Sequence, residues 1–184
     1  MRIIAGLLKG RSLATPKTAD IRPTSDRLRE TLFNILSHRF KDIVEQARVL
    51  DVFAGSGSLA FEALSRGAKF ACLVDNGIEA RGLLRANVEA LGLGGVTRIL
   101  KRDACKLGNV SPFEPFSLVF MDPPYGKGLC EQALKSGYEG GWFAKNALFV
   151  LEERASVDIV LPDWFDLLDR REAGEGQVWI GKMK

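Results

Sequence analysis

The residues with the clearest chemical potential lie in MDPPYGKGL, Met121 to Leu129. Asp122 stands directly before Pro123, Pro124 and Tyr125, and an apolar run, SLVFM, leads into it. Consecutive prolines lack backbone N–H groups, forbid helix and hold the preceding residue extended, so a rigid turn at the end of a buried strand is predicted. Such a turn offers a ligand a carboxylate, rigid carbonyls and an aromatic ring. The two prolines alone are equally typical of a structural turn.

A glycine-rich turn is the second candidate site. DVFAGSGSLAFEAL places Gly55, Ser56 and Gly57 between an apolar run and a helical pattern. Glycines allow a tight turn and close approach of a ligand, and the following helix presents free amides at its start. The run from Gly55 to Ala60 also satisfies the dinucleotide pattern GxGxxA, with Asp75 at the spacing of a ribose-binding acid. This turn alone leaves NAD binding and a purely structural role open.

Acids at the ends of three successive predicted strands favour a different nucleoside. Asp51 precedes Gly55 by four residues, where its charge opposes a pyrophosphate but attracts a cationic ammonium, directly or through water. Asp75 is placed to accept from ribose hydroxyls, and Asp103, in KRDACKL, from an adenine amino group. Each acid alone is typical of a strand-end cap or a surface charge. Together they favour a ligand with an adenosine end and a charged amino-acid end.

Composition limits the function classes. With 184 residues, 46% of them hydrophobic, the chain can bury one core and is expected to be a single domain. No apolar run approaches the roughly 20 residues of a membrane-spanning helix, and the amino terminus lacks a signal-peptide layout, so we expect a soluble, cytoplasmic protein. Cys72, Cys105 and Cys130 lack a metal-ligand spacing, which predicts reduced thiols and no metal site. The chain has a single histidine, His38, so the sequence gives little support for catalysis by a Ser-His or Cys-His pair.

Positive charge is concentrated at the amino terminus. Residues 1–29 carry seven basic and two acidic side chains, a net charge of +5, whereas the whole chain has a net charge of +3. We expect Arg2, Lys9, Arg11 and Arg22 to track a phosphate backbone, as in nucleic-acid binding. A solvated charged face explains the same charges equally well.

Hydrophobic periodicity predicts the elements that position these residues. Residues 1–23 form a basic hairpin or arm around a Lys9-Gly10 turn, and an amphipathic helix spans residues 24–41 with Thr24 or Ser25 as its cap. A Rossmann-like α/β core covers residues 48–184. Its expected strands are 48–53, 70–75, 96–101, 117–122 and 147–153, with helices at 58–66, 78–91 and 129–135.

The order of these elements predicts the topology. Alternating strands and helices form a mostly parallel sheet that is covered on both faces. After Asp163 two strands flank the turn 174–176 as an antiparallel hairpin, which gives about seven strands with the last one reversed. Ligands of such sheets bind beyond the carboxyl ends of the strands. The glycine turn and the Asp122 turn both fall on that edge.

Together, DVFAGSG and the later DPPY resemble the S-adenosylmethionine-dependent methyltransferases of exocyclic nucleobase amines, in which DPPY is the target-base motif. More narrowly, RIIAG, KGR, RPTSDRLRETLFNIL, DVFAGSGSLAFEALSRGA and MDPPYGKGL resemble the RsmD family, which methylates guanine N2 in bacterial 16S rRNA. The resemblance spans almost the entire chain. It implies a class I methyltransferase fold, S-adenosylmethionine as cofactor, and 16S rRNA or the small ribosomal subunit, as an assembly intermediate, as partner.

The resemblance also completes the set of site residues. It implies that RPTSDRLRE helps enclose cofactor and substrate and that the basic arm meets RNA. The expected cofactor-binding residues are Asp51, Phe53, Gly55, Ser56, Gly57, Asp75, Asn76, Asp103, Ala104, Thr24 and Arg27. Asp75 stands where the family is expected to have Glu, and the shorter acid still accepts from ribose hydroxyls. From Ala155 onward the match is weak and supports the fold more than the substrate.

The chemistry of the Asp122 turn follows from the acceptor. An exocyclic amine is a poor nucleophile because its lone pair is delocalised into the ring, so the site must orient it. Asp122 and the Pro123 carbonyl are acceptors that can hold both amino hydrogens, and Pro123 and Pro124 keep them rigid. Tyr125 offers a stacking face, worth roughly 1–3 kcal/mol, to a base turned out of its RNA context.

Rival functions use parts of the same pattern. An adenine-N6 methyltransferase acting on DNA or RNA has the same DPPY motif, although a separate DNA-recognition domain is not evident in so short a chain. A protein glutamine methylase typically has Asn where this chain has Asp122. A dehydrogenase needs a hydride-handling site, and a non-catalytic RNA-binding module would keep only the core. With no long apolar stripe to suggest a dimer, a monomer is expected.

Overall fold

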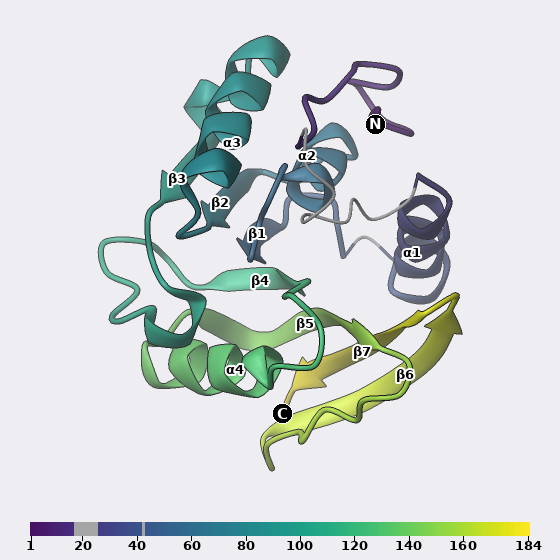
Figure 1. Cartoon of the computed structure of the whole chain (residues 1–184), viewed down its shortest axis with the longest axis vertical. Helices are drawn as coiled ribbons and strands as arrows, with labels where there is room; N and C mark the ends of the chain where they lie inside the picture. Colours follow the sequence, from purple (N-terminus) through teal and green to yellow (C-terminus); the bar gives the residue numbers. More distant parts are fainter. Residues whose placement is uncertain (17–25, 42) are drawn as a thin grey trace.

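The computed structural model of the chain describes residues 1–16, 26–41 and 43–184. Its centre is a seven-stranded sheet with the order β3-β2-β1-β4-β5-β7-β6 (Figure 1). Neighbouring strands from β3 to β5 pair in parallel, and β7 is antiparallel to both β5 and β6. The predicted fold class, a mostly parallel sheet with a reversed last strand, is confirmed. The strands are β1 (Arg48–Val52), β2 (Phe70–Val74), β3 (Thr97–Leu100), β4 (Phe116–Met121), β5 (Phe143–Arg154), β6 (Phe165–Ala173) and β7 (Gly176–Met183).

Helices cover both faces of the sheet (Figure 1). Helices α1 (Asp26–Arg39), α2 (Ser58–Ser65) and α3 (Ile78–Leu91) join one buried cluster, and α4 (Leu129–Glu139) joins the other with the 3-10 turn η2 (Ala104–Lys106). A second 3-10 turn, η1 (Gly94–Val96), precedes β3. Successive strand residues point to opposite faces, so Val49 packs in the first cluster and Leu50 in the second. Because helices cover both faces of the sheet, the side chains on both faces of the central strands are buried, and these strands are continuous apolar runs.

Two elements are longer than predicted. Helix α4 continues past residue 135 to Glu139, although glycine usually weakens a helix interior. A Cβ at Gly137 would lie 2.2 Å from the Phe143 ring, so glycine is needed for close packing there. Strand β5 begins at Phe143 rather than at residue 147, and Asn146 has a φ of 62° beside a register shift. This bulge lies ahead of the apolar run at residues 147–151, so the predicted strand covers only the regular part after it.

The amino-terminal arm closes as a loop with a single antiparallel bridge, between Arg2 and Ser12, rather than as two regular strands. The Gly10 amide donates to the Ile3 carbonyl at 2.9 Å, and the Leu13 amide to the Met1 carbonyl at 3.0 Å. Ile3 and Leu13 are buried in the cluster of α1, α2 and α3. The arm therefore joins the core through apolar side chains, although its sequence is basic.

The start of the predicted amino-terminal helix, including its cap at Thr24 or Ser25, lies outside the described residues. In the ranges that the structure describes, no helix combines the length and apolarity needed to cross a membrane. Cys72, Cys105 and Cys130 are free thiols in the structure, and burial raises the pKa of Cys72 to about 12. A cluster of metal-binding side chains is likewise not found among these described residues.

Candidate functional site

The carboxyl ends of β1, β2 and β4 bring the two sequence motifs to one edge of the sheet. The parallel register pairs Val52 with both Val74 and Met121. The next residue on each strand is Phe53, Asp75 or Asp122, so the glycine turn, the ribose-type acid and the DPPY turn begin side by side. This is the edge at which open α/β sheets bind ligands.

The glycine turn is held rigidly in an unusual backbone conformation. Phe53, Gly55 and Gly57 have positive φ angles of 68°, 55° and 79°. A non-glycine residue in this region costs of order 1–3 kcal/mol and needs its surroundings to hold it. The amides of Phe53 and Ala54 both donate to the Val74 carbonyl, at 3.1 and 3.0 Å. At Gly57 a Cβ would lie 2.4 Å from the Phe61 ring, so protein packing by itself requires this glycine.

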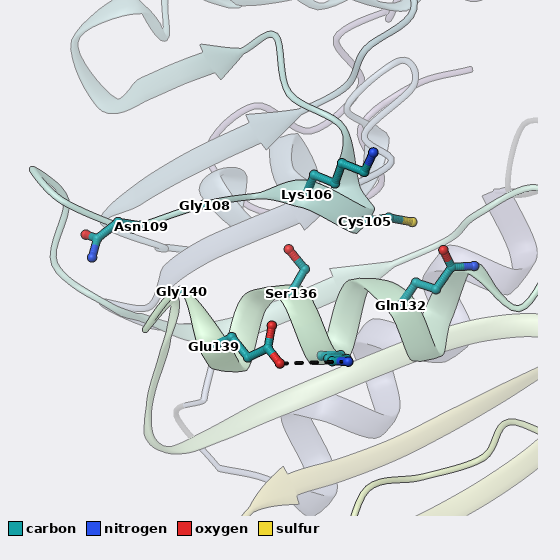
Figure 2. Close-up of a pocket in the computed structure, with 9 residues that line it drawn as sticks. Cys105, Lys106, Gly108, Asn109, Gln132, Ser136, Glu139 and Gly140 are labelled. Atoms are coloured by element: carbon teal, nitrogen blue, oxygen red, sulfur yellow. Dashed lines mark ion pairs between the residues drawn. The ribbon is translucent and has the colours of Figure 1, made fainter.

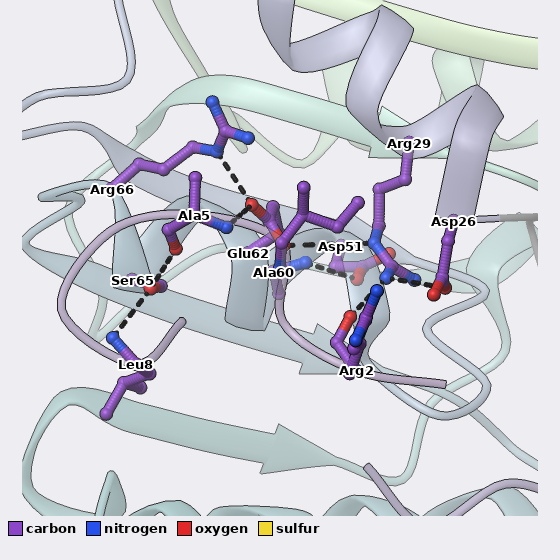
Figure 3. Close-up of polar contacts among 11 residues, drawn as sticks. Arg2, Ala5, Leu8, Asp26, Arg29, Asp51, Ala60, Glu62, Ser65 and Arg66 are labelled. Atoms are coloured by element: carbon purple, nitrogen blue, oxygen red, sulfur yellow. Dashed lines mark hydrogen bonds and ion pairs between the residues drawn. The ribbon is translucent and has the colours of Figure 1, made fainter. Parts of the chain in front are cut away.

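Asp51 lies beneath this turn and is only 2% exposed. Its carboxylate accepts from the Ala60 amide at 3.3 Å, in the first turn of α2 (Figure 3). Burial raises the pKa of Asp51 well above its ordinary 3.8, the Ala60 hydrogen bond opposes that shift, and the negative charges of Asp122 and Asp75 add to it. These charge effects are consistent with the strand register, which brings the three acids to the same edge of the sheet. Such burial favours an influence on a ligand through space or water over direct contact.

Asp75 ties the glycine turn to the end of β2. One carboxylate oxygen accepts from the Gly55 amide at 3.0 Å, and the other accepts from the Gly77 amide at 2.8 Å. The carboxylate is half-buried and each oxygen has a further lone pair, so ribose hydroxyls remain possible donors. Asn76 is exposed beside it, and its carbonyl accepts from the buried Arg81 side chain. Asp75 is therefore part of the scaffold as well as a candidate ligand contact.

Asp103 follows β3 and caps the 3-10 turn η2. Its carboxylate accepts from the Cys105 amide at 2.9 Å, while the residue as a whole is exposed. Ala104, the next residue, is 5% exposed and packs in the cluster of α4. The capping role and the predicted adenine contact are compatible, because a carboxylate has about four acceptor positions.

The DPPY turn at the end of β4 is held by the neighbouring strand. Pro123 is buried, Pro124 is exposed, and Asp122 and Tyr125 are half-buried. The Tyr125 hydroxyl donates to Glu152 Oε1 at 2.5 Å. The following amide, of Gly126, donates to Glu153 Oε1 at 2.9 Å. Sequence analysis missed both glutamates. Their signal was a pair of acids at the end of a strand that is otherwise apolar.

A buried ion-pair network fixes the amino-terminal arm to α1 and α2 (Figure 3). Glu62 is fully buried and accepts from the Ile4 and Ala5 amides at 2.8 and 3.0 Å. Its carboxylate also lies 2.8 Å from Arg66 Nε and 3.9 Å from Nε of the buried Arg29. Glu62 thus anchors the backbone of the arm at Ile4 and Ala5.

The predicted RNA-contacting residues of the arm differ in their surroundings. Arg2, Lys9 and Arg11 are all exposed, but the Arg11 guanidinium donates to the Ala90 carbonyl at the end of α3. Arg22 and the predicted cofactor residue Thr24 lie outside the described residues. Arg27 is exposed in the first turn of α1.

Asn87 connects the arm to the glycine turn, a link that sequence analysis also missed. This α3 side chain is 1% exposed. Its amide nitrogen donates to the Ser56 carbonyl at 2.9 Å and to the Ala14 carbonyl at 3.1 Å, while its oxygen accepts from the Ala14 amide at 2.7 Å. Asn87 therefore satisfies backbone groups of the turn and of the arm together.

A separate open groove of about 640 Å³ lies between η2 and α4 (Figure 2). Its polar lining includes Lys106, Asn109, Gln132 and Ser136. Among the described residues, those predicted for cofactor binding or catalysis do not line this groove. Its lining does include Cys105, which directly follows Asp103 and Ala104, the residues predicted to contact the adenine. The candidate site is thus defined by the strand ends and not by this groove.

Comparison with known proteins gives concordant matches. The family model described as conserved hypothetical protein 95 matches residues 1–182. The chain is 38% identical to ribosomal RNA small subunit methyltransferase D of Escherichia coli K12, over 95% of this chain and 86% of the relative. It is 35% identical to the Haemophilus influenzae protein of the same name, over 95% of this chain and 89% of the relative.

Solved structures agree with these sequence matches. The Escherichia coli protein yhhF superposes with a TM-score of 0.85 at 33% identity, covering 100% of this chain and 98% of its own. A hypothetical protein from Thermus thermophilus superposes with a TM-score of 0.74 at 34% identity, covering 98% of both chains. The likeness therefore includes the arm as well as the sheet.

Proposed function

The chain belongs to the family described as conserved hypothetical protein 95, the RsmD family, and from this premise we propose that it methylates the N2 amine of a guanine in 16S rRNA. The methyl donor is S-adenosylmethionine. The observation that carries the proposal is the meeting of the glycine turn and the DPPY turn at the ends of β1 and β4. Residues 1–184 act as a single methyltransferase domain in this proposal.

The residues at this edge fit the proposed cofactor. Asp75 has free acceptor positions for ribose hydroxyls, and Asp103 and Ala104 lie one strand further along for the adenine. The acidic environment around Asp51 suits a cation and opposes a pyrophosphate, which disfavours NAD. When bound, S-adenosylmethionine supplies a methyl group that its sulfonium already activates. The protein therefore has to orient the acceptor.

Asp122 and its neighbours carry out that orientation. The Asp122 carboxylate and the Pro123 carbonyl accept the two hydrogens of the guanine amine and direct its lone pair. Asp122 then holds the proton that the amine releases. Tyr125 stacks on the displaced base, and its hydroxyl bond to Glu152 limits the orientations of the ring. Rigid acceptors avoid reorganisation during the transfer.

The substrate is proposed to be 16S rRNA or the small ribosomal subunit during assembly, approached by a monomer in the cytoplasm. Arg2 and Lys9 are exposed on an arm that Asn87 links to the glycine turn through Ala14. RNA bound along the arm would thereby be connected to the glycine turn through the Asn87 contacts. Electrostatic attraction of this kind is independent of sequence, so the DPPY turn must select the base.

The proposal is tested by offering labelled S-adenosylmethionine with naked 16S rRNA, unmethylated small subunits or DNA. Nucleosides from each reaction are identified by mass spectrometry. N2-methylguanosine from an RNA substrate is the expected product, and the preferred RNA substrate would place the enzyme before or after particle assembly. N6-methyladenine would instead assign the chain to the adenine methyltransferases. Cofactor binding without product on any substrate would favour a non-catalytic RNA-binding module.

A further inference from the structure

We propose that Glu152 and Glu153, at the end of β5, are positioning residues that hold the acceptor loop, residues 122–126, in its working orientation. Glu152 acts on the Tyr125 ring and Glu153 on the loop backbone at Gly126. This inference rests on the proposed function and deepens it, because it names what orients the base-binding side of the same site.

The strand register explains how two distant glutamates reach the loop. Strand β4 pairs in parallel with β5, and the last pair is Met121 with Leu151. The next residue on each strand is Asp122 or Glu152. As both chains run in the same direction, the end of β5 accompanies the start of the acceptor loop.

The two carboxylates hold the loop from opposite faces of the sheet. Val150 packs in the cluster of α1, α2 and α3, whereas Leu151 packs in the cluster of α4. Pairing of β5 with β7 continues without interruption through Arg154, so the alternation persists. Glu152 therefore shares the face of Val150, and Glu153 shares the face of Leu151. A loop held from both faces cannot tilt toward either one.

The Glu152 bond fixes the direction of the Tyr125 ring. An O–H···O distance of 2.5 Å to a carboxylate is typical of a strong, charge-assisted hydrogen bond. On another side, a Cβ at Gly176 would lie 2.8 Å from the Tyr125 hydroxyl, so the start of β7 also closes around this group. The ring that is proposed to stack on the base is thus fixed at its hydroxyl end.

Glu153 fixes the backbone where the loop is intrinsically most flexible. Gly126 and Gly128 both have positive φ angles, 72° and 61°, on either side of Lys127. A single oxygen, Glu153 Oε1, accepts from the Gly126 amide at 2.9 Å and from the Arg154 amide at 2.8 Å. Glu153 is 1% exposed, and a buried carboxylate is costly unless its hydrogen bonds are made. Its position is therefore coupled to the correct placement of the loop.

Conservative and disruptive variants separate positioning from simple stability. Glu153→Gln keeps an acceptor oxygen for both amides, whereas Glu153→Leu removes it. We expect the Leu variant to lower kcat by about a hundredfold, the size of effect that a displacement of about 1 Å produces. The Gln variant should remain within about tenfold of wild type, and the KM for S-adenosylmethionine should change little in both. Glu172→Gln, on the exposed part of β6, is the matched control.

Fluorine NMR gives a readout that needs no RNA substrate. The chain has two tyrosines, Tyr125 and Tyr138, so 3-fluorotyrosine labelling yields two resonances that Tyr138→Phe assigns. Glu152→Leu should shift and broaden the Tyr125 resonance, and the Glu172→Gln control should not. Amide exchange at Gly126 should accelerate in Glu153→Leu and stay slow in Glu153→Gln.

These results distinguish failure of the inference from failure of the proposed function. Wild-type kcat in Glu153→Leu, equal loss in its Gln and Leu variants, or an unmoved Tyr125 resonance in Glu152→Leu would each overturn the positioning role. A wild-type chain that methylates no RNA would overturn the proposed function alone. In that case the Tyr125 resonance and the Gly126 exchange rate still decide whether the glutamates hold the loop.

Discussion

The cofactor side and the acceptor side of the site are built by different kinds of contact. On the cofactor side, acids bond amides 2 to 20 positions away: Asp103 bonds Cys105 across two positions, Asp51 bonds Ala60 across nine, and Asp75 bonds Gly55 across 20. On the acceptor side, Tyr125 and Gly126 are both held by glutamates 27 positions later. The acids of the first region thus reach their amides over shorter chain distances, whereas the second region depends on the correct pairing of β4 with β5.

The amino-terminal arm resembles the acceptor side in this respect. Its amides at Ile4 and Ala5 bond to Glu62, 58 and 57 positions away, and Ala14 bonds to Asn87 across 73 positions. The parts of the molecule proposed to meet RNA are therefore held by remote buried side chains. We expect substitutions at these anchors to affect RNA methylation without touching RNA.

The largest effect is expected from Glu62→Ala, which tests whether a remote anchor also stabilises the fold. Removing the acid leaves the buried Arg29 without one of its compensating charges, and breaking a buried ion pair costs about 3–5 kcal/mol. Glu62→Gln, which keeps an acceptor oxygen for the arm, should lose less. Urea denaturation measures the free energy of unfolding, with the exposed Glu89→Ala on α3 as control. A loss below about 1 kcal/mol in Glu62→Ala would show that the Glu62 ion-pair network does not stabilise the fold.

The second largest effect is expected from Asp122→Ala, which should impair the acceptor side of the site and leave the cofactor side intact. Asp122→Ala should lower kcat by about 10²–10³-fold, the range found when one transition-state hydrogen-bonding group is removed. The dissociation constant for S-adenosylmethionine should stay within a few fold of wild type, because Asp75 and the glycine turn remain. Isothermal titration and single-turnover kinetics measure the two quantities, and Asp163→Ala, at an exposed position before β6, is the control. Near-normal turnover with intact cofactor binding would refute the role of Asp122.

The difference between local and remote contacts also explains which parts of the site could be predicted from the sequence. Strand runs, the glycine turn and the DPPY turn are local patterns, and the sheet order then brings Asp51, Asp75 and Asp122 together as expected. Glu153 and Asn87 were missed because each acts on a backbone group far along the chain. A lone buried acid or amide has no periodic signature, so only the strand pairing and helix packing reveal its partner.

Local details were missed when packing overrode propensity. Helix α4 extends beyond its predicted end at residue 135 and past Gly137, where the Phe143 ring occupies the space of a Cβ. Conversely, Gly57 was assigned to ligand approach, and the structure shows that the Phe61 ring already requires a glycine there. In both cases the reason for the residue is a neighbour that the linear pattern does not contain.

The buried charge on the cofactor side predicts a pH dependence. The pKa of folded Asp51 lies well above the ordinary 3.8, mainly through burial. Between these two values the folded protein binds more protons than the unfolded chain, so the stabilisation present at low pH is lost as the pH rises. Asp51→Asn should flatten the pH dependence of the unfolding free energy from about pH 3.8 upward, relative to wild type. Parallel profiles for the two proteins would contradict this assignment.

Cofactor binding should reveal the same group independently. A cationic ligand near Asp51 favours the ionised carboxylate, so binding should release a proton within the window in which Asp51 is protonated. The dissociation constant for S-adenosylmethionine should then fall as the pH rises, by at most about tenfold per pH unit, which is the limit for the release of one proton. Titrations in two buffers of different ionisation enthalpy measure the proton count. Equal proton release by wild type and Asp51→Asn would assign it to another group.

The smallest effect concerns the charges of the arm, because its backbone stays anchored when they are removed. Each lost phosphate contact reduces the slope of log affinity against log salt by roughly 0.7–0.9, so Arg2→Gln with Lys9→Gln should reduce it by about 1.5. Arg11→Gln should change the slope less, since this guanidinium already donates to the Ala90 carbonyl. Lys145→Gln, at an exposed position near the start of β5, is the control. An unchanged slope in the double variant would show that Arg2 and Lys9 do not contact phosphates, and would refute the proposed role of the arm in RNA binding.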